Sequence, residues 1–179
     1  SFTPNKLNAI IGPSGSGKTT LTDILLGLRD PTSGYISMNN KKLKSLNSKN
    51  IILNVGYVPQ KIFIINGNII QNICLGIDKN FYDIDKVKQC LRLADLEEFV
   101  EENDTGIYRN IGEKGSKLSG GQIQRIGIAR SLYTNPQILI FDEVTSSLDA
   151  IAEKKFYSTL FKLLELDKTI ILITHKVNY

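Results

Sequence analysis

The chain has 179 residues, of which 41% are hydrophobic and 22% are charged, with a formal net charge of +4 and a pI near 9.0. This composition indicates one folded domain with its own core and excludes a disordered chain. The mild positive charge suits an anionic ligand but does not indicate a nucleic-acid-binding protein, and no apolar run approaches the roughly 20 residues of a membrane-spanning helix.

The first 66 residues alternate between strand-like and helix-like patterns. Residues 7–11 are a short apolar run that predicts a buried strand, and residues 18–28 have the apolar spacing of a helix that ends near Gly27. The runs at 34–39 and 54–59 predict an edge or hairpin strand and a further short strand.

The pattern changes between residues 67 and 116, where short helical segments and turn-rich stretches follow one another without strands. We expect this segment to be a helical lobe inserted in an α/β core. Cys74 and Cys90 fall within it, without the spacing of a metal site. They fit buried free thiols in a reducing compartment better than a disulfide.

After this lobe the α/β pattern resumes. Residues 120–133 and 149–166 predict helices, the second of them amphipathic, and residues 138–142 predict a strand. The nearly unbroken apolar run at 169–174 is what a strand buried on both faces needs. Strands that alternate with helices predict an α/β fold with a mostly parallel sheet.

A glycine-rich turn at residues 12–19, GPSGSGKT, matches the phosphate-binding pattern G-x-x-x-x-G-K-[ST] in full. Its backbone N–H groups can surround phosphates, Lys18 can reach the β- and γ-phosphates of a nucleotide, and the Thr19 hydroxyl can ligate Mg²⁺. A predicted strand before the turn and a helix after it favour this function over a chance match. The predicted nucleotide-binding residues here are Gly12, Pro13, Ser14, Gly15, Ser16, Gly17, Lys18, Thr19 and Thr20.

Two adjacent carboxylates stand at the end of the predicted strand 138–142. Asp142 can hold the Mg²⁺ shell through water, and Glu143 can face an attacking water. Glu143 could instead cap the helix that follows, but the intact phosphate loop favours the catalytic role.

A second glycine-rich turn, LSGGQ at residues 118–122, precedes a predicted helix about a hundred residues later. Ser119, Gly120 and Gly121 offer a hydroxyl and N–H groups at a helix N-terminus, which favours an anion, although a plain serine N-cap would look the same. With this turn the chain resembles ATP-binding cassette (ABC) ATPases over essentially its whole length. The motifs stand in that family's order: Walker A 12–19, Q-loop Gln60, signature 118–122, Walker B 138–142 with Glu143, D-loop 146–149 and switch His175.

The resemblance implies a P-loop NTPase core with a mostly parallel sheet and an inserted α-helical subdomain, truncated at both ends. It divides a single ABC ATPase domain, residues 1–179, into a RecA-like core at 1–66 and 117–179 and a helical subdomain at about 67–116. The signature motif then lies where the chain returns to the core.

The resemblance also gives each motif residue a role. It implies ATP and Mg²⁺ as cofactors, with Glu143 polarising the water, His175 contacting the γ-phosphate and Gln60 coupling the site to the helical lobe. On the residues alone, Gln60 and His175 could be ordinary polar positions. The expected catalytic residues are Lys18, Gln60, Glu143 and His175, and the expected metal-binding residues are Thr19, Gln60 and Asp142.

In the family, two domains stack head to tail, and the signature turn of one covers the nucleotide held by the other. This arrangement explains why one chain has two turns that can bind phosphate, and it implies a second nucleotide-binding domain as partner. Asp149 of the D-loop would touch the partner's Walker A loop, although it could merely start the next helix. The residues expected to reach the partner's nucleotide are Ser119, Gly120, Gly121, Gln122 and Asp149.

Two segments resemble exporter-type members: residues 61–76 after Gln60, and the loop 111–122 with Glu113 and Gly115 at its middle. They imply an exporter or flippase at the cytoplasmic face of the inner or plasma membrane, contacting that membrane only through a transmembrane domain, with no nucleic-acid partner. The alternative is a soluble ABC ATPase of DNA maintenance or ribosome function. The short gap between the motifs, without heptads or a second cassette, disfavours it.

Overall fold

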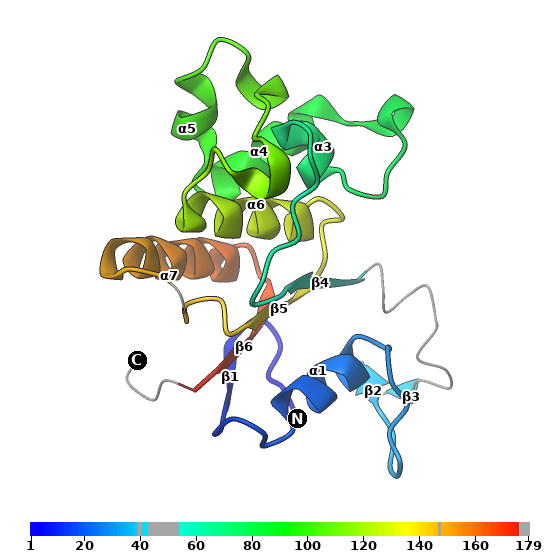
Figure 1. The fold of residues 1–179 in the computed structure, drawn as a ribbon. Helices are drawn as coiled ribbons and strands as arrows, with labels where there is room; N and C mark the ends of the chain where they lie inside the picture. The colour runs from blue at the N-terminus through cyan, green and yellow to red at the C-terminus, as the bar shows by residue number, and fades with distance from the viewer. Residues whose placement is uncertain (39–40, 43–53, 147, 176–179) are drawn as a thin grey trace.

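The computed structural model describes residues 1–38, 41–42, 54–146 and 148–175. A four-stranded parallel sheet in the order β1-β6-β5-β4 forms its centre, with α1 on one face and α6 and α7 on the other (Figure 1). The strands are β1 (Leu7–Ile11), β4 (Val55–Val58), β5 (Ile138–Asp142) and β6 (Thr169–Thr174). The flanking helices are α1 (Lys18–Leu25), α6 (Gly120–Leu132) and α7 (Ala150–Glu165).

The α/β fold with a parallel sheet is confirmed, and so are most of the predicted strands. The exception is the burial of β1, which was expected to be a buried strand and is not. Among the described strands β1 pairs with β6 alone and lies at the sheet edge, so Leu7 and Ile11 are 43% and 50% exposed. A short apolar run identifies a strand but does not say how many neighbours it has.

The run at 34–39 is a strand only over β2 (Ser37–Met38), which pairs antiparallel with β3 (Lys41–Lys42). This agrees with the expected hairpin strand, although residue 39 lies outside the described residues. The hairpin sits beside α1, away from the helical lobe (Figure 1).

The core has two layers because successive residues of a strand point to opposite faces. On one face Phe141 of β5 meets Phe156 of α7 edge to face, with ring centroids 5.5 Å apart. On the other face Ile140 and Ile173 pack against Leu25 of α1. Burying both faces of β5 and β6 stabilises the two strands whose carboxyl ends carry the acidic residues and the histidine described below.

Residues 67–116 form helices and turns without a strand, as predicted. A continuous apolar cluster runs from this lobe through α6 to the sheet, so the division into subdomains at 67 and 116 stays a prediction. The elements of the lobe are α3 (Ile69–Ile73), η1 (Lys79–Phe81), α4 (Ile84–Leu93), α5 (Glu97–Glu101), η2 (Gly106–Tyr108) and η3 (Glu113–Gly115).

Cys74 and Cys90 are free and buried in the lobe, as expected, and burial raises the pKa of Cys90 to about 11. Within the described ranges, no helix combines the length and the apolar content that crossing a membrane requires.

A fully buried asparagine, Asn72 of α3, fixes the chain segment that enters the lobe. Its Oδ1 accepts from the amide of Ile65 at 2.9 Å, and its Nδ2 donates to the carbonyls of Ile65 at 3.2 Å and Asn68 at 3.0 Å. The bonds to Ile65 satisfy backbone groups of the segment between β4 and α3, and the third bond adds to the N-terminal cap of α3.

We therefore expect Asn72→Leu to lower the free energy of unfolding by about 1–3 kcal/mol, because the Ile65 amide and carbonyl lose their partner in a partly buried segment. Urea denaturation measures this. The matched control is Gln89→Ala on the exposed face of α4, where the change stays within about 0.5 kcal/mol. Equal stability of Asn72→Leu and the parent chain would contradict the assignment.

Candidate functional site

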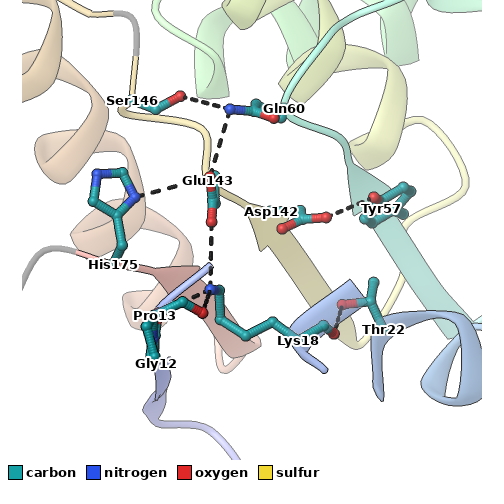
Figure 2. A network of polar contacts seen from close by, with 10 residues as sticks. All are labelled: Gly12, Pro13, Lys18, Thr22, Tyr57, Gln60, Asp142, Glu143, Ser146 and His175. Atoms are coloured by element: carbon teal, nitrogen blue, oxygen red, sulfur yellow. Dashed lines mark hydrogen bonds and ion pairs between the residues drawn. The ribbon is translucent and has the colours of Figure 1, made fainter. Parts of the chain in front are cut away.

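The candidate site lies at the carboxyl ends of the parallel strands, which all meet at one edge of the sheet. The chain leaves β1 into the loop 12–17, passes from β4 to Gln60, from β5 to Glu143 and from β6 to His175. Figure 2 shows the side chains of Gln60, Glu143 and His175 converging with Lys18 from α1. Segments far apart in the sequence are thus brought together by the sheet topology alone.

The loop between β1 and α1 is shaped to receive an anion. Gly15 and Gly17 have φ values of 78° and 90°, which favour glycine, and an added Cβ at either position would meet nothing within 4 Å. Gly17 is the N-cap of α1 but forms no side-chain cap bond, so the first amides of the helix have no partner from the cap. Free amides and the helix dipole at this point favour phosphate.

Lys18 reaches back over this loop. Its Nζ donates to the carbonyls of Gly12 at 2.8 Å and Pro13 at 2.9 Å, and lies 3.6 Å from Glu143 Oε1. The side chain is only 10% exposed. The ammonium is therefore fixed between the loop 12–17 and the turn at Glu143, where it can serve both a phosphate and a carboxylate.

Glu143 stands at the centre of the polar contacts in Figure 2. Besides Lys18, its carboxylate contacts Gln60 Nε2 at 3.5 Å and His175 Nδ1 at 3.8 Å, both through Oε2. Its backbone has a positive φ of 49°, and its amide donates to the carbonyl of Ile173 on β6 at 2.9 Å. The direction of the carboxylate is thus set by a backbone conformation that residues other than glycine rarely adopt.

Asp142 is oriented by a neighbour that the motif analysis did not include. The Tyr57 hydroxyl on β4 donates to Asp142 Oδ2 at 3.1 Å. Burial raises the pKa of Asp142 above its ordinary value, and the adjacent Glu143 raises it further, while the Tyr57 bond and the Lys18 charge oppose the rise. The same burial and the Asp142 carboxylate raise the pKa of Tyr57, so the phenol remains a donor at neutral pH.

The predicted metal-binding residues supply oxygen ligands, which Mg²⁺ prefers. Asp142 is half-buried and held by Tyr57, Thr19 is exposed in the first turn of α1, and Gln60 is exposed next to Glu143. In the described residues no cluster of three or more His, Cys, Asp and Glu could hold a metal. The oxygens of Asp142, Thr19 and Gln60 fit a hard cation such as Mg²⁺ by their chemistry.

The signature turn is presented separately from these residues. Ser119 is the exposed N-cap of α6: its Oγ accepts from the Gln122 amide at 3.2 Å, and Gln122 Oε1 accepts from the Ser119 amide at 2.8 Å. Gly120 is exposed and Gly121 half-buried behind it. Within the described part of the chain, no hydrogen bond or ion pair links this turn to Lys18 or Glu143.

Asp149 does start a helix, as the simpler alternative had it. Its side chain accepts from the Ala152 amide at 2.8 Å as the N-cap of α7, and the residue is exposed. The expected contact of Asp149 with a partner domain stays a prediction.

Sequence reasoning did not single out Tyr57 or Ser146, whose hydroxyl accepts from Gln60 Nε2 at 3.2 Å. For both residues the sequence offered a partial indication, because each lies in or beside a recognised motif. Tyr57 is three residues before Gln60 on the predicted strand, and Ser146 begins the D-loop. The pairing with Asp142 and Gln60 depends on the strand order, which the sequence does not state.

Comparison with known proteins identifies the family to which the chain belongs. A family model described as ABC transporter matches residues 1–146. The chain belongs to the ABC transporter family. It corresponds to the ATP-binding ATPase domain of that family, and its parallel sheet with flanking helices is the expected ABC ATPase fold.

Similar proteins are much longer than this ABC ATPase domain. The ATP-dependent lipid A-core flippase of Ralstonia nicotianae is 38% identical over 171 residues, which cover 95% of this chain and 29% of the flippase. The mitochondrial ATP-binding cassette sub-family B member 10 of Mus musculus is 37% identical over 179 residues, 99% of this chain and 25% of that protein.

A solved structure of a bacterial Atm1-family ABC exporter with ATP bound matches 98% of the domain and 30% of its own chain, with a TM-score of 0.85 and 33% identity. The domain therefore spans less than a third of the length of each of these three proteins.

The Tyr57 bond generates a prediction about protonation. A pKa raised in the folded state means that Asp142 stabilises the fold at low pH, and that this contribution is lost as the pH rises through the folded-state pKa. Tyr57→Phe removes a cause that lowers this pKa, so we expect the pKa of Asp142 to rise further, and the destabilisation by the substitution to grow with pH.

An NMR titration of the Asp142 carboxyl carbon in metal-free buffer measures this shift. Tyr108→Phe, at an exposed position of the helical lobe, serves as the control and leaves the titration unchanged. A pKa of Asp142 that stays the same or falls in Tyr57→Phe would show that the phenol does not stabilise the carboxylate.

Proposed function

We propose that this domain binds Mg²⁺–ATP and hydrolyses it to drive transport of a substrate across a membrane, as part of an exporter or flippase. The observation that carries the proposal is the convergence on Glu143: Lys18, Gln60 and His175 come from three other motif segments, and all three contact this one carboxylate. A structural acidic residue at a helix start would not need these partners, and the cap of α7 is Asp149.

ATP would lie along the loop 12–19. The amides around Gly15 and Gly17 and the Lys18 ammonium would compensate the phosphate charge, which is the main requirement of phosphoryl transfer. Gly12, Pro13, Ser14, Ser16 and Thr20 would shape the loop and the start of α1. Thr19, Asp142 and Gln60 would hold Mg²⁺, and the ion would supply neutralisation of the phosphate charge.

Glu143 would orient and polarise the attacking water. Its carboxylate is 25% exposed, so it is open to a water on one side while Lys18 fixes Oε1 and the side chains of Gln60 and His175 approach Oε2. His175 is half-exposed beside it and would turn toward the γ-phosphate. Gln60 also donates to Ser146 and directly precedes the segment that enters the helical lobe, so it would report the state of the site to that lobe.

The second half of each site would come from another domain of the same kind. Ser119 and Gly120 are exposed at the N-terminus of a 13-residue helix, where the dipole favours an anion. Gly121 and Gln122 shape that turn, and Asp149 lies exposed at the start of α7. A head-to-tail dimer would place these residues over the partner's nucleotide and close two sites at once.

A transmembrane domain would be the second partner, and this domain would stand at the cytoplasmic face of the inner or plasma membrane. The support is the likeness to a flippase and an exporter, with the domain covering only a small part of each, together with the exporter-type segments 61–76 and 111–122. These relatives favour transport over a soluble ATPase of DNA maintenance or the ribosome.

Glu143→Gln tests the chemistry. It keeps the shape of the side chain but removes the charge that polarises the water, so we expect ATP binding within about threefold of the parent, turnover reduced at least about 100-fold, and an ATP-stabilised dimer. Phosphate release and analytical ultracentrifugation with and without Mg²⁺–ATP measure these properties on the full polypeptide.

The matched control is Glu98→Gln on the exposed face of α5, which removes the same charge and leaves turnover unchanged. Hydrolysis by Glu143→Gln at the parent rate would contradict the assigned role of this carboxylate.

A further inference from the structure

We propose that Gln124 is a positioning residue that ties the signature turn to the catalytic turn, so that the two move as one unit. The proposal rests on the function proposed above, because it assigns Ser119 and Glu143 to opposite halves of two nucleotide sites. Gln124 belongs to neither turn, and none of the roles assigned above uses it.

The link is a single buried hydrogen bond. Gln124 lies in α6 and is 5% exposed, and its Nε2 donates to the carbonyl oxygen of Val144 at 2.9 Å. Val144 directly follows Glu143 and is itself 1% exposed. A side-chain amide that is buried this deeply, and that bonds to the backbone of another segment, fixes the separation of the two segments.

Val144 belongs to a turn whose shape has to be maintained. The Glu143 amide donates to Ile173 on β6, and the Ser146 amide donates back to the Glu143 carbonyl at 3.0 Å. Glu143 keeps its positive φ between these bonds. The bond from Gln124 attaches this turn to α6, whereas the two backbone bonds connect it to the sheet and to itself.

At the other end, α6 carries the signature tip rigidly. Ser119 precedes Gln124 by five residues, about 7.5 Å along a helix axis. The first turn of α6 is also close-packed against α7, because a Cβ on Gly121 would lie 3.5 Å from the Cβ of Ala152. A displacement of the Ser119 tip by a partner's nucleotide is therefore transmitted through Gln124 to the backbone beside Glu143.

This arrangement separates catalysis from binding. Within one copy the nucleotide is held by the loop 12–19 and Lys18, which Gln124 does not contact, whereas the direction of the Glu143 carboxylate depends on the turn that Gln124 holds. Loss of the bond lowers kcat and leaves the affinity for ATP unchanged.

The experiment uses Gln124→Met in the full polypeptide, because methionine has a similar length and cannot donate. We expect kcat to fall about three- to tenfold, the equivalent of one hydrogen bond, with the Kd for ATP within twofold of the parent. If Gln124→Met does not fold, Gln124→Ala, which leaves room for water beside the Val144 carbonyl, takes its place with the same expected outcomes.

Ser131→Ala is the matched control. Ser131 is buried in the same helix, and its Oγ donates to the Ile128 carbonyl at 2.8 Å, so the control also loses one buried bond of α6. It destabilises the domain in urea without changing kcat per folded molecule. A kcat of Gln124→Met that follows only the folded fraction would overturn the proposal and show a purely structural role.

Combining Gln124→Met with Ser119→Ala tests the linkage itself. Residues that act through one unit give a combined loss of kcat smaller than the product of the single losses, and independent multiplication of the two effects would overturn the proposal. Failure of the proposed function looks different: the parent chain would then not turn over ATP at all.

Discussion

The contact between Lys18 and Glu143 is the constraint on which the rest of the site depends. An ammonium and a carboxylate, 10% and 25% exposed, lie 3.6 Å apart at the edge of the sheet. The attraction aims the carboxylate across the phosphate loop, and the Ile173 carbonyl fixes its backbone at a positive φ. Because neither group can move far without leaving a poorly solvated charge behind, the loop, the sheet edge and the catalytic turn keep one geometry.

The parallel sheet explains why so few residues are needed to build this geometry. All four strands end at the same edge, so the residues that follow them meet without long connecting loops. Helix α6 serves a different purpose: it packs against α3, α4 and β4 and carries its N-terminal turn away from the Lys18–Glu143 pair. One chain thus presents the loop 12–19 and the exposed Ser119 turn at separate places, and the proposed dimer would bring the loop of one copy to the turn of the other.

Much of this arrangement could be predicted from the sequence, because the Walker A loop, the Walker B strand and the buried run of β6 are local patterns. What could not be predicted depends on neighbours. The exposure of β1 follows from its place at the sheet edge, and Tyr57 meets Asp142 because it pairs with Ile140, two residues before Asp142 on the same face. The Gln124 bond joins segments 20 residues apart through tertiary packing, which no spacing pattern reveals.

The central claim is that each nucleotide is held by Lys18 of one copy and covered by Ser119 of another. Its most direct test combines a Lys18→Ala chain with a Ser119→Arg chain, both in the Glu143→Gln background so that ATP is not consumed. The two chains carry different tags and are purified through both, ATP bound loosely by a single copy is washed out, and the ATP that stays trapped per pair is counted. Neither variant alone forms a complete site, but the mixed pair has one site with both residues intact. We expect one retained ATP per mixed pair and none for either variant alone. A mixed pair that retains none, or a Ser119→Arg chain that retains as much ATP as the parent, would contradict it.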